Sequence, residues 1–366
     1  MHSPSKLDRT YYSRFKTESV SVALVGLGAL GSEIARQLGL LGVGTVALVD
    51  NGLIEPVNSS QNIFFRKQSN LARSKAEVIA DEGVTYFHKT KWIPLISEIA
   101  DVGLGKLSDC SIIFSATDSA LSRVETAYTA RRLGIPMIDA GLLGSAYWRG
   151  RVAWFSSHQE AACYFCQLSE NRRAEILALS HSPTLGCQLA EENVDMPSTP
   201  TMSAVVAGIA IDLAFRHGLP AGENHSFAWD IDLGHPPNLK AHSLTASSTC
   251  PFHHFREKSA LIPLPFNRSF DESLRAVNID TVELDWPIVV LATCSKCGCD
   301  WRPMRRLAWS RKHSQCFNCG ETNHFRFKAI HRISVGDASA RHTPADLSYS
   351  KDHLFSPVYD SGRQQS

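Results

Sequence analysis

The stretch Val22–Asp50, VALVGLGALGSEIARQLGLLGVGTVALVD, predicts a strand, a glycine-rich turn, a helix and a second strand. VALVG is a short apolar run, and Ala29–Leu41 places apolar side chains at helical spacing on one face. TVALVD is again apolar and ends on an acid, Asp50. A parallel strand pair joined by a helix is the smallest unit of an α/β sheet, so this stretch sets the fold class.

Strand and helix patterns continue to alternate downstream of this unit. The alternation predicts a Rossmann-like, mostly parallel sheet with helices on both faces. The further segments are helix 71–82, strand CSIIFSATD, helix 119–133, strands IPMIDAG and GRVAWF, and helix 202–216 with Pro200 at or just before its first turn. Between residues 167 and 200 the periodicity fades, which predicts a crossover loop.

The glycine loop predicts a nucleotide site. Gly26, Gly28 and Gly31 lie between the first strand and its helix, where glycine allows a tight turn and close approach of the backbone to phosphate. Asp50 ends the second strand, where an acid can accept a hydrogen bond from a ribose hydroxyl. The alternative is a tight turn that is only structural. The loop itself does not distinguish a dinucleotide from a nucleoside triphosphate.

Polar and cationic residues beyond the second strand favour a nucleoside triphosphate. Asn58, Arg66 and Lys75 follow that strand, and Asp118 ends a later one. Cleavage of a triphosphate requires neutralisation of the phosphates and of the leaving pyrophosphate, and Asp118 is placed to hold Mg²⁺. Taken singly, Lys75 could be a solvated helix residue and Asp118 a helix N-cap. A dehydrogenase remains an alternative, but hydride transfer has no general need for these charges.

Residues 12–216 resemble the ThiF/MoeB superfamily of adenylating enzymes, which includes the ubiquitin-activating enzymes. The matching elements are the glycine loop, Asp50, Asn58, Lys75 and Thr117-Asp118. YYSRF matches the Tyr-Ser-Arg of the family, which makes Arg14 the candidate arginine that reaches into the nucleotide site of a partner protomer. The stretch from WRGRVAWF to CYFC matches the approach to the first zinc cysteine pair of the family.

The resemblance implies an enzyme that uses ATP and Mg²⁺ to adenylate the C-terminal carboxylate of a small ubiquitin-like protein, and that forms a homodimer. The sequence departs from the family at one site residue. The family pattern Asn-x-x-Arg-Gln stands here as Asn58-Ser-Ser-Gln61-Asn62, so Gln61 replaces an arginine and offers phosphate no positive charge. Arg66 has its own family counterpart and is the candidate to compensate in part.

Cys187 is the candidate nucleophile. Its segment, LGCQLAEENVDMPSTPT, is polar, weakly patterned and followed by a helix, and it resembles the thioester-forming segment of some bacterial ubiquitin-like-protein-activating enzymes. A nucleophilic cysteine needs exposure and a lowered pKa, which a helix N-terminus or a cation can supply. The alternatives are a buried free cysteine and, less in keeping with its isolation, a zinc ligand.

Paired cysteines predict two zinc sites. Cys163-x-x-Cys166 and Cys250-x-x-His253 supply two half-sites of a structural tetrahedral site, with His254 as a rival ligand. A second site, typical of a zinc ribbon, is predicted from the pairs Cys294/Cys297 and Cys316/Cys319, with Cys299 as an alternative to Cys297.

Charge and composition limit the partners. The net charge of +1 gives the whole chain no bias toward nucleic acid or anionic membranes, and no apolar run is long enough to cross a membrane. We therefore expect a cytoplasmic protein. Cations outnumber acids between residues 294 and 328, which suits an acidic partner such as a conjugating enzyme, or nucleic acid, or simply a solvated surface.

The expected organisation follows from these patterns. An N-terminal arm covers residues 1–20, the ThiF-type adenylation domain 21–250, a connector 251–290, the zinc-ribbon module 291–333 and a poorly ordered tail 334–366. Two further functional readings stay open: adenylation of a sulfur carrier or a peptide without a thioester, and a non-catalytic zinc-containing scaffold or nucleic-acid-binding protein on the same fold.

Overall fold

A computed structural model describes residues 16–60, 62–143, 147–181, 199–215, 224–253, 260–322 and 324–358. Within residues 177–181 it describes the helix but not the side chains. Arg14, Gln61, Cys187 and His254 lie outside the described residues. None of the helices in the described ranges combines the length and the apolar character that a membrane span needs.

The chain divides into two compact units. The first comprises Met1–Val102, Leu107–Gln167 and Asn193–Phe255, and the second comprises Gly103–Lys106, Leu168–Glu192 and Arg256–Ser366. Each unit has its own sheet.

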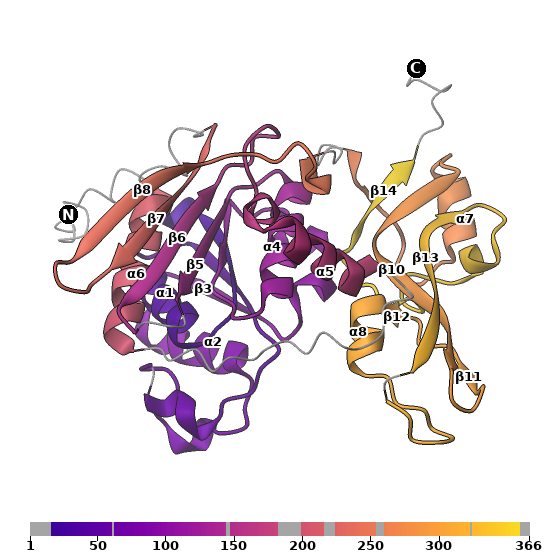
Figure 1. Ribbon diagram of the computed structural model, residues 1–366, viewed down its shortest axis with the longest axis horizontal. Helices are drawn as coiled ribbons and strands as arrows, with labels where there is room; N and C mark the ends of the chain where they lie inside the picture. Colours follow the sequence, from indigo (N-terminus) through magenta and orange to yellow (C-terminus); the bar gives the residue numbers. More distant parts are fainter. Residues whose placement is uncertain are drawn as a thin grey trace. The chain divides into compact units, whose positions relative to one another are not determined.

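The sheet of the first unit has eight strands in the order β3-β2-β1-β4-β5-β6-β7-β8. Figure 1 labels β3, β5, β6, β7 and β8 of this sheet. The five strands from β3 to β5 are parallel, and β6, β7 and β8 continue the sheet antiparallel. The strands are β1 (Ser21–Val25), β2 (Thr45–Val49), β3 (Lys91–Leu95), β4 (Ile112–Ser115), β5 (Met137–Leu142), β6 (Arg149–Phe155), β7 (Ser226–Asp232) and β8 (Asn238–Leu244). The predicted fold class is confirmed. The sequence patterns did not reveal β7 and β8.

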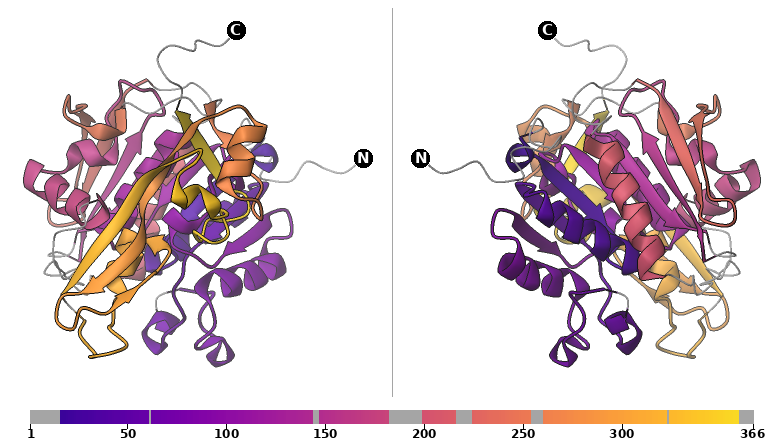
Figure 2. Two further views of the ribbon diagram at one scale, coloured as in Figure 1. Left: turned by 90° about the vertical axis from the view of Figure 1, so that its right-hand side faces the viewer. Right: turned by 90° about the vertical axis from the view of Figure 1, so that its left-hand side faces the viewer.

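Helices cover both faces of this sheet. Alternate strand residues such as Val22 and Leu24 share one apolar core with side chains of α1 (Ala29–Leu40), α2 (Lys75–Tyr86) and α6 (Pro200–Leu213). In the views of Figure 2, α1 and α6 lie side by side, and the two helices are in contact. The intervening strand residues face the other side, where α4 (Ala120–Leu133) packs against β4 and β5.

Local sequence explains where these helices begin. The side chains of Ser74, Ser119 and Thr199 accept hydrogen bonds from the first turns of α2, α4 and α6, respectively. A hydroxyl at this position satisfies an amide that has no partner inside the helix. The α1 helix differs, because its N-cap is Gly28 and no side chain caps it. The N-terminus of α1 therefore keeps free amides for another acceptor.

The second unit is built around the long strand β10 (Thr281–Cys294). It pairs with β11 (Asp300–Trp301), β12 (Arg305–Arg306), β13 (Phe325–Ser334) and β14 (Leu354–Val358), and β14 pairs with β9 (Ile262–Pro263). The described helices of this unit include α5 (Glu170–His181), α7 (Phe270–Ala276) and α8 (Leu307–Lys312), and the short α3 (Leu104–Leu107) lies at its boundary with the first unit. The sequence predicts a boundary between the connector and the zinc-ribbon module after residue 290. The strand β10 crosses this boundary, so the two expected segments share one strand.

Two sequence predictions need correction in this unit. Residues 334–358, expected to be a poorly ordered tail, end in β14, and Ala340, Leu347 and Phe355 are buried in the same core as Phe270. The apolar residues of this segment are few, but the fold brings them into one core. The low apolar content of the segment does not reveal this. The segment 167–200, expected to be a loop, contains α5.

Replacement of Phe355 tests the corrected position of the tail. The side chain is 2% exposed and packs edge-on against Phe270, with ring centroids 5.3 Å apart. We expect Phe355→Ala to lower the free energy of unfolding of the second unit by about 3–5 kcal/mol in chemical denaturation. The exposed Lys351 provides the control, because Lys351→Ala should change stability by less than about 0.5 kcal/mol. Equal stability of the two variants would contradict the packing of this segment.

Candidate functional site

The glycine loop connects β1 to α1 at the carboxyl edge of the parallel strands. Gly26 has a φ of 86°, and a Cβ placed on it would lie 2.7 Å from the amide nitrogen of Thr117, beyond the end of β4. The amide of Gly26 also donates to the carbonyl of Val49, and that of Ala116 donates to the carbonyl of Val25. The loop is therefore fixed between the ends of β2 and β4, where the strand order turns and α/β sheets bind ligands.

The other two loop glycines have different reasons to be glycine. A Cβ on Gly31 would lie 1.8 Å from the carbonyl oxygen of Gly26, so the first turn of α1 contacts the loop too closely for any side chain. A Cβ on Gly28 would meet nothing within 4 Å. Folding thus requires glycine at 26 and 31, whereas the open space at Gly28 suits a ligand that approaches the backbone.

Asp50 ties the loop to β2. One of its carboxylate oxygens accepts a hydrogen bond of 2.7 Å from the amide of Leu27, and the other accepts one of 2.7 Å from the amide of Gly52. Each carboxylate oxygen has two lone pairs, so both can accept a further bond, for example from ribose hydroxyls. Asp50 therefore fixes the loop, and its role toward a ribose stays a prediction.

Lys75 is brought close to Asp50. A Cβ on Gly52 would lie 2.9 Å from a carboxylate oxygen of Asp50 and 3.5 Å from Nζ of Lys75, so the two side chains converge beside Gly52. Lys75 is held there at the first position of α2, and its amide donates to the carbonyl of Gly52. The lysine therefore lies beside Asp50 and the glycine loop, and not only on a solvated helix face.

Asp118 lies two residues beyond the close contact between Gly26 and Ala116. Its side chain is exposed, while Ser119 provides the cap of α4. The N-cap alternative for Asp118 is therefore wrong. An exposed carboxylate at this edge suits a divalent cation that also binds phosphate.

Asn58 and Arg66 are placed differently from each other. Asn58 is buried, and its side-chain oxygen accepts a hydrogen bond of 2.9 Å from the amide of Glu55, which shapes the turn at η4 (Pro56–Ser60). Arg66 is exposed. Gln61, between them, lies outside the described residues, as do Arg14 and Cys187. Their roles stay predictions.

Sequence reasoning missed a buried ion pair at the same edge of the sheet. The guanidinium of Arg123, on α4, binds both carboxylate oxygens of Asp139, on β5, at 2.6 and 2.7 Å. Burial disfavours the charged guanidinium, but Asp139 above all, then Tyr164 and Asp118, more than offset this, and the pKa of Arg123 is raised. Asp139 stands within the apolar run IPMIDAG, and a lone acid in a buried strand is the signal that could have found the pair.

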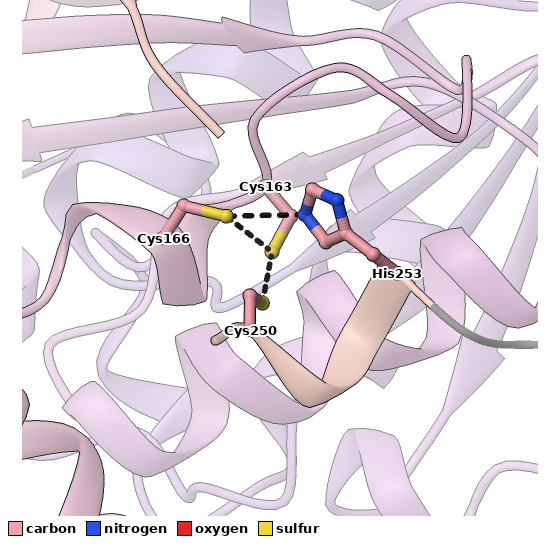
Figure 3. A group of neighbouring side chains, drawn as sticks. All are labelled: Cys163, Cys166, Cys250 and His253. Atoms are coloured by element: carbon pink, nitrogen blue, oxygen red, sulfur yellow. Dashed lines mark hydrogen bonds between the residues drawn. The ribbon is translucent and has the colours of Figure 1, made fainter. Parts of the chain in front are cut away.

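The first cysteine cluster brings together two distant parts of the chain. Cys163 and Cys166 converge with Cys250 and His253, and the four side chains point toward one another (Figure 3). The Sγ of Cys163 lies 3.7 Å from that of Cys166 and 3.6 Å from that of Cys250, while His253 Nε2 lies 3.1 Å from the Sγ of Cys166. The structure thus places His253 in the predicted ligand set.

Aromatic packing aligns the two halves of this cluster. Phe165 and Phe252 occupy equivalent positions in the two half-sites and stack with centroids 4.7 Å apart, and Tyr128 of α4 packs edge-on against Phe252. Arg131, in the last turn of α4, donates hydrogen bonds to the carbonyls of His158 and Ala161, just before Cys163. All four residues of the cluster belong to the first unit.

The second cluster lies in the ribbon. The Sγ of Cys294 is 3.6 Å from that of Cys319, and the Sγ of Cys297 is 3.5 Å from that of Cys316. Cys299 is not part of the cluster, so the alternative to Cys297 is excluded. Cys294 and Cys316 are buried, whereas Cys297 is exposed.

The geometry of both clusters fits zinc. Within each, the four ligand atoms lie within 4.8 Å of one another. Tetrahedral bonds of about 2.3 Å from zinc to sulfur place two sulfurs ~3.7 Å apart, close to the spacings found here.

The closeness of the thiols also shifts their pKa values in opposite directions within each cluster. Hydrogen bonds from Cys163 and Cys250 lower the pKa of Cys166 far below its usual range, and the pKa of Cys297 is lowered to about 6, chiefly by the side chain of Asn318. Thiolates are the form that binds metal.

Comparison with known proteins identifies the family. Residues 12–251 match the model of the ThiF family, and the chain belongs to this family. The chain is 24% identical over 232 residues to the sulfur carrier protein ThiS adenylyltransferase of Escherichia coli, which covers 63% of this chain and 84% of the relative. It is also 28% identical over 132 residues to a ubiquitin-activating enzyme E1-like protein of Saccharomyces cerevisiae, which covers 35% of this chain but only 20% of the relative.

A solved structure supports the fold. MccB of Escherichia coli, determined with AMPCPP and MccA, superimposes with a TM-score of 0.50 at 16% identity, over 69% of this chain and 75% of that one. At this identity the similarity concerns the fold alone.

Substitutions of the loop glycines test folding and ligand binding separately. We expect Gly31→Ala to destabilise the first unit by more than about 3 kcal/mol, because its Cβ collides with a backbone carbonyl. We expect Gly28→Ala to keep wild-type stability, because its Cβ meets no protein atom, and to weaken ATP binding at least about tenfold. Thermal denaturation and calorimetric titration with ATP measure the two effects. Full ATP affinity in Gly28→Ala would place the nucleotide elsewhere.

Metal analysis tests the two clusters. We expect the purified protein to contain about two zinc ions per chain, and Cys250→Ser to contain about one. A chelator should remove the ribbon metal first, because Cys297 is exposed while the three cysteines of the first cluster are buried. Mass spectrometry and a colorimetric zinc indicator provide the measurements. A folded protein with a single metal ion in both forms would refute one of the sites.

Proposed function

We propose that this chain uses ATP to adenylate the C-terminal carboxylate of a small ubiquitin-like or sulfur-carrier protein that ends in glycine. One observation carries the proposal. The uncapped N-terminus of α1, the open space at Gly28, and the converging side chains of Asp50 and Lys75 lie together at the carboxyl edge of the sheet. This arrangement occurs in a chain of the ThiF family, whose relatives include named adenylyltransferases.

The reaction suits the residues at this edge. A carboxylate oxygen of the carrier attacks the α-phosphorus of ATP, the bond to the bridging oxygen breaks, and pyrophosphate leaves. No side chain has to act as the nucleophile. In this proposal the α1 amides bind phosphate, Asp50 orients the ribose and Lys75 neutralises charge that develops on the phosphates.

Asp118 would hold Mg²⁺ in the same site. Its exposed carboxylate offers the oxygen ligand that this ion prefers, and the ion would neutralise phosphate charge. Arg123 and Asp139 position this edge, because their largely buried ion pair fixes α4 to β5, and the guanidinium of Arg123 also interacts electrostatically with Asp118.

A homodimer would complete the site. The family resemblance assigns Arg14 to the nucleotide site of the partner protomer, where it would add a positive charge. Such a charge matters here because Gln61 replaces the expected arginine, and the exposed Arg66 is the other candidate to compensate.

The fate of the adenylate distinguishes two forms of the proposal. In the first, Cys187 attacks the carbonyl carbon of the adenylate, AMP leaves, and the carrier is held as a thioester before transfer to a conjugating enzyme. In the second, the adenylate of a sulfur carrier or peptide reacts without a thioester on the enzyme. The resemblance of the Cys187 segment to ubiquitin-like-protein-activating enzymes favours the first. The two zinc ions would be structural in both.

Two other classes of function make different predictions. A dehydrogenase would bind a nicotinamide dinucleotide in preference to ATP. A non-catalytic scaffold would show no pyrophosphate exchange, and salt-sensitive binding to DNA or RNA would support a nucleic-acid-binding role.

A pair of variants tests the proposal. We expect exchange between ATP and pyrophosphate that depends on a small ubiquitin-like or sulfur-carrier protein ending in glycine. Lys75→Ala should reduce the exchange at least about a hundredfold, because phosphate charge is no longer neutralised. Cys187→Ala should retain the exchange but lose a carrier adduct that thiol reagents release. An adduct that persists in Cys187→Ala would exclude a thioester on Cys187, and absence of exchange in the wild type would exclude adenylation.

A further inference from the structure

Helix α5 belongs to the second unit, although in sequence it interrupts the adenylation domain. The helix begins after Ser169, whose hydroxyl accepts a hydrogen bond from the amide of Arg172. It packs against α8 and β10, the elements that adjoin it in Figure 1. Ile176, 1% exposed, is its deepest described side chain. Because Cys187 follows this helix in sequence, the second unit holds one end of the segment that contains it.

Both packing partners of α5 are attached to the ribbon cluster. The strand β10 ends at Cys294, a member of the cluster, and α8 is followed in the same stretch of chain by Cys316. Within the cluster Cys294 adjoins Cys319, and Cys297 adjoins Cys316. A metal bound there ties the end of β10 to the segment that follows α8.

Apolar packing alone joins these two elements weakly. The core cluster between them has only three fully buried members among the described residues, Val289, Ala292 and Leu307. A core of this size contributes a few kcal/mol, and small modules of this kind commonly need a metal to fold. Strand β12, directly before α8, pairs with β10 and holds the first residue of the helix there. The end of α8 leads to Cys316, so the cluster is the tie that holds this end near β10, and with it part of the surface that receives α5.

We infer that the four-cysteine cluster is a positioning device for helix α5. Metal bound by the cluster holds the end of α8 near β10, and the two elements together hold the helix that precedes Cys187 in sequence. The functional consequence rests on the proposed function: transfer of the carrier to Cys187 would require the ribbon metal, whereas adenylation, which uses residues of the first unit, would not.

Two variants of the 366-residue chain test the effect of the metal and the effect of apolar packing separately. Cys297→Ser removes an exposed ligand, and Cys299→Ser is its matched control, since Cys299 lies beside the cluster but outside it. Ile176→Ala removes packing from α5 without changing a ligand, and Asn171→Ala, at an exposed position of the same helix, is its control. Ile176→Ala keeps the inference testable should Cys297→Ser fail to fold.

Hydrogen exchange of the peptide that covers residues 170–181 provides a readout independent of activity. We expect exchange about tenfold faster or more in Cys297→Ser and in Ile176→Ala, with normal zinc content in the latter and wild-type exchange in both controls. Peptides of β1 and β4 should keep their protection in all variants. Wild-type exchange of α5 in Cys297→Ser protein that has lost its ribbon metal would overturn the inference.

Activity measurements then test the functional consequence. We expect Cys297→Ser and Ile176→Ala to form the carrier adduct on Cys187 about tenfold more slowly, while exchange between ATP and pyrophosphate continues at the wild-type rate. Parallel loss of both activities would contradict a role limited to α5. Absence of pyrophosphate exchange in the wild type would refute the proposed function and not the inference, which the hydrogen exchange of α5 decides by itself.

Discussion

The contact between the first turn of α1 and the glycine loop is the constraint on which the candidate site depends. A side chain at Gly31 would collide with the carbonyl of Gly26, and one at Gly26 would collide with the backbone beyond β4. With glycine at both positions, α1 begins directly above the end of β1. The hydrogen bonds from Leu27 and Gly52 to Asp50 then add the end of β2 to the same structure. Three parallel strands thus end around one uncapped helix N-terminus.

The two cysteine clusters provide constraints of another kind. The first joins the segment after β6 to the segment after β8, and the stacked rings of Phe165 and Phe252 align its halves. The second joins β10 to the chain beyond α8, where few apolar side chains are buried. In both places a set of metal ligands connects segments that secondary structure leaves separate. Metal bound there would stabilise tertiary contacts directly.

The sequence patterns predicted the parts of the fold that local chemistry determines. The glycine loop, the first parallel strands, α1 and the ligand sets of both clusters could be read from residue spacing. The strands β7 and β8 escaped notice, because on exposed antiparallel strands such as β8 polar residues dominate. The tail of the second unit escaped notice for a related reason, since Leu347 and Phe355 are isolated in sequence and become a core only when they meet Phe270.

The sequence by itself determined that the chain has an α/β fold with a glycine loop, an acid at the end of the second strand and two sets of metal ligands, because spacing fixes these features locally. Only the tertiary structure decided that Lys75 converges with Asp50, that Arg123 pairs with Asp139 and that α5 belongs to the second unit. These contacts join residues from different elements. Their partners are chosen by packing and by the burial of charge, which no spacing along the chain encodes.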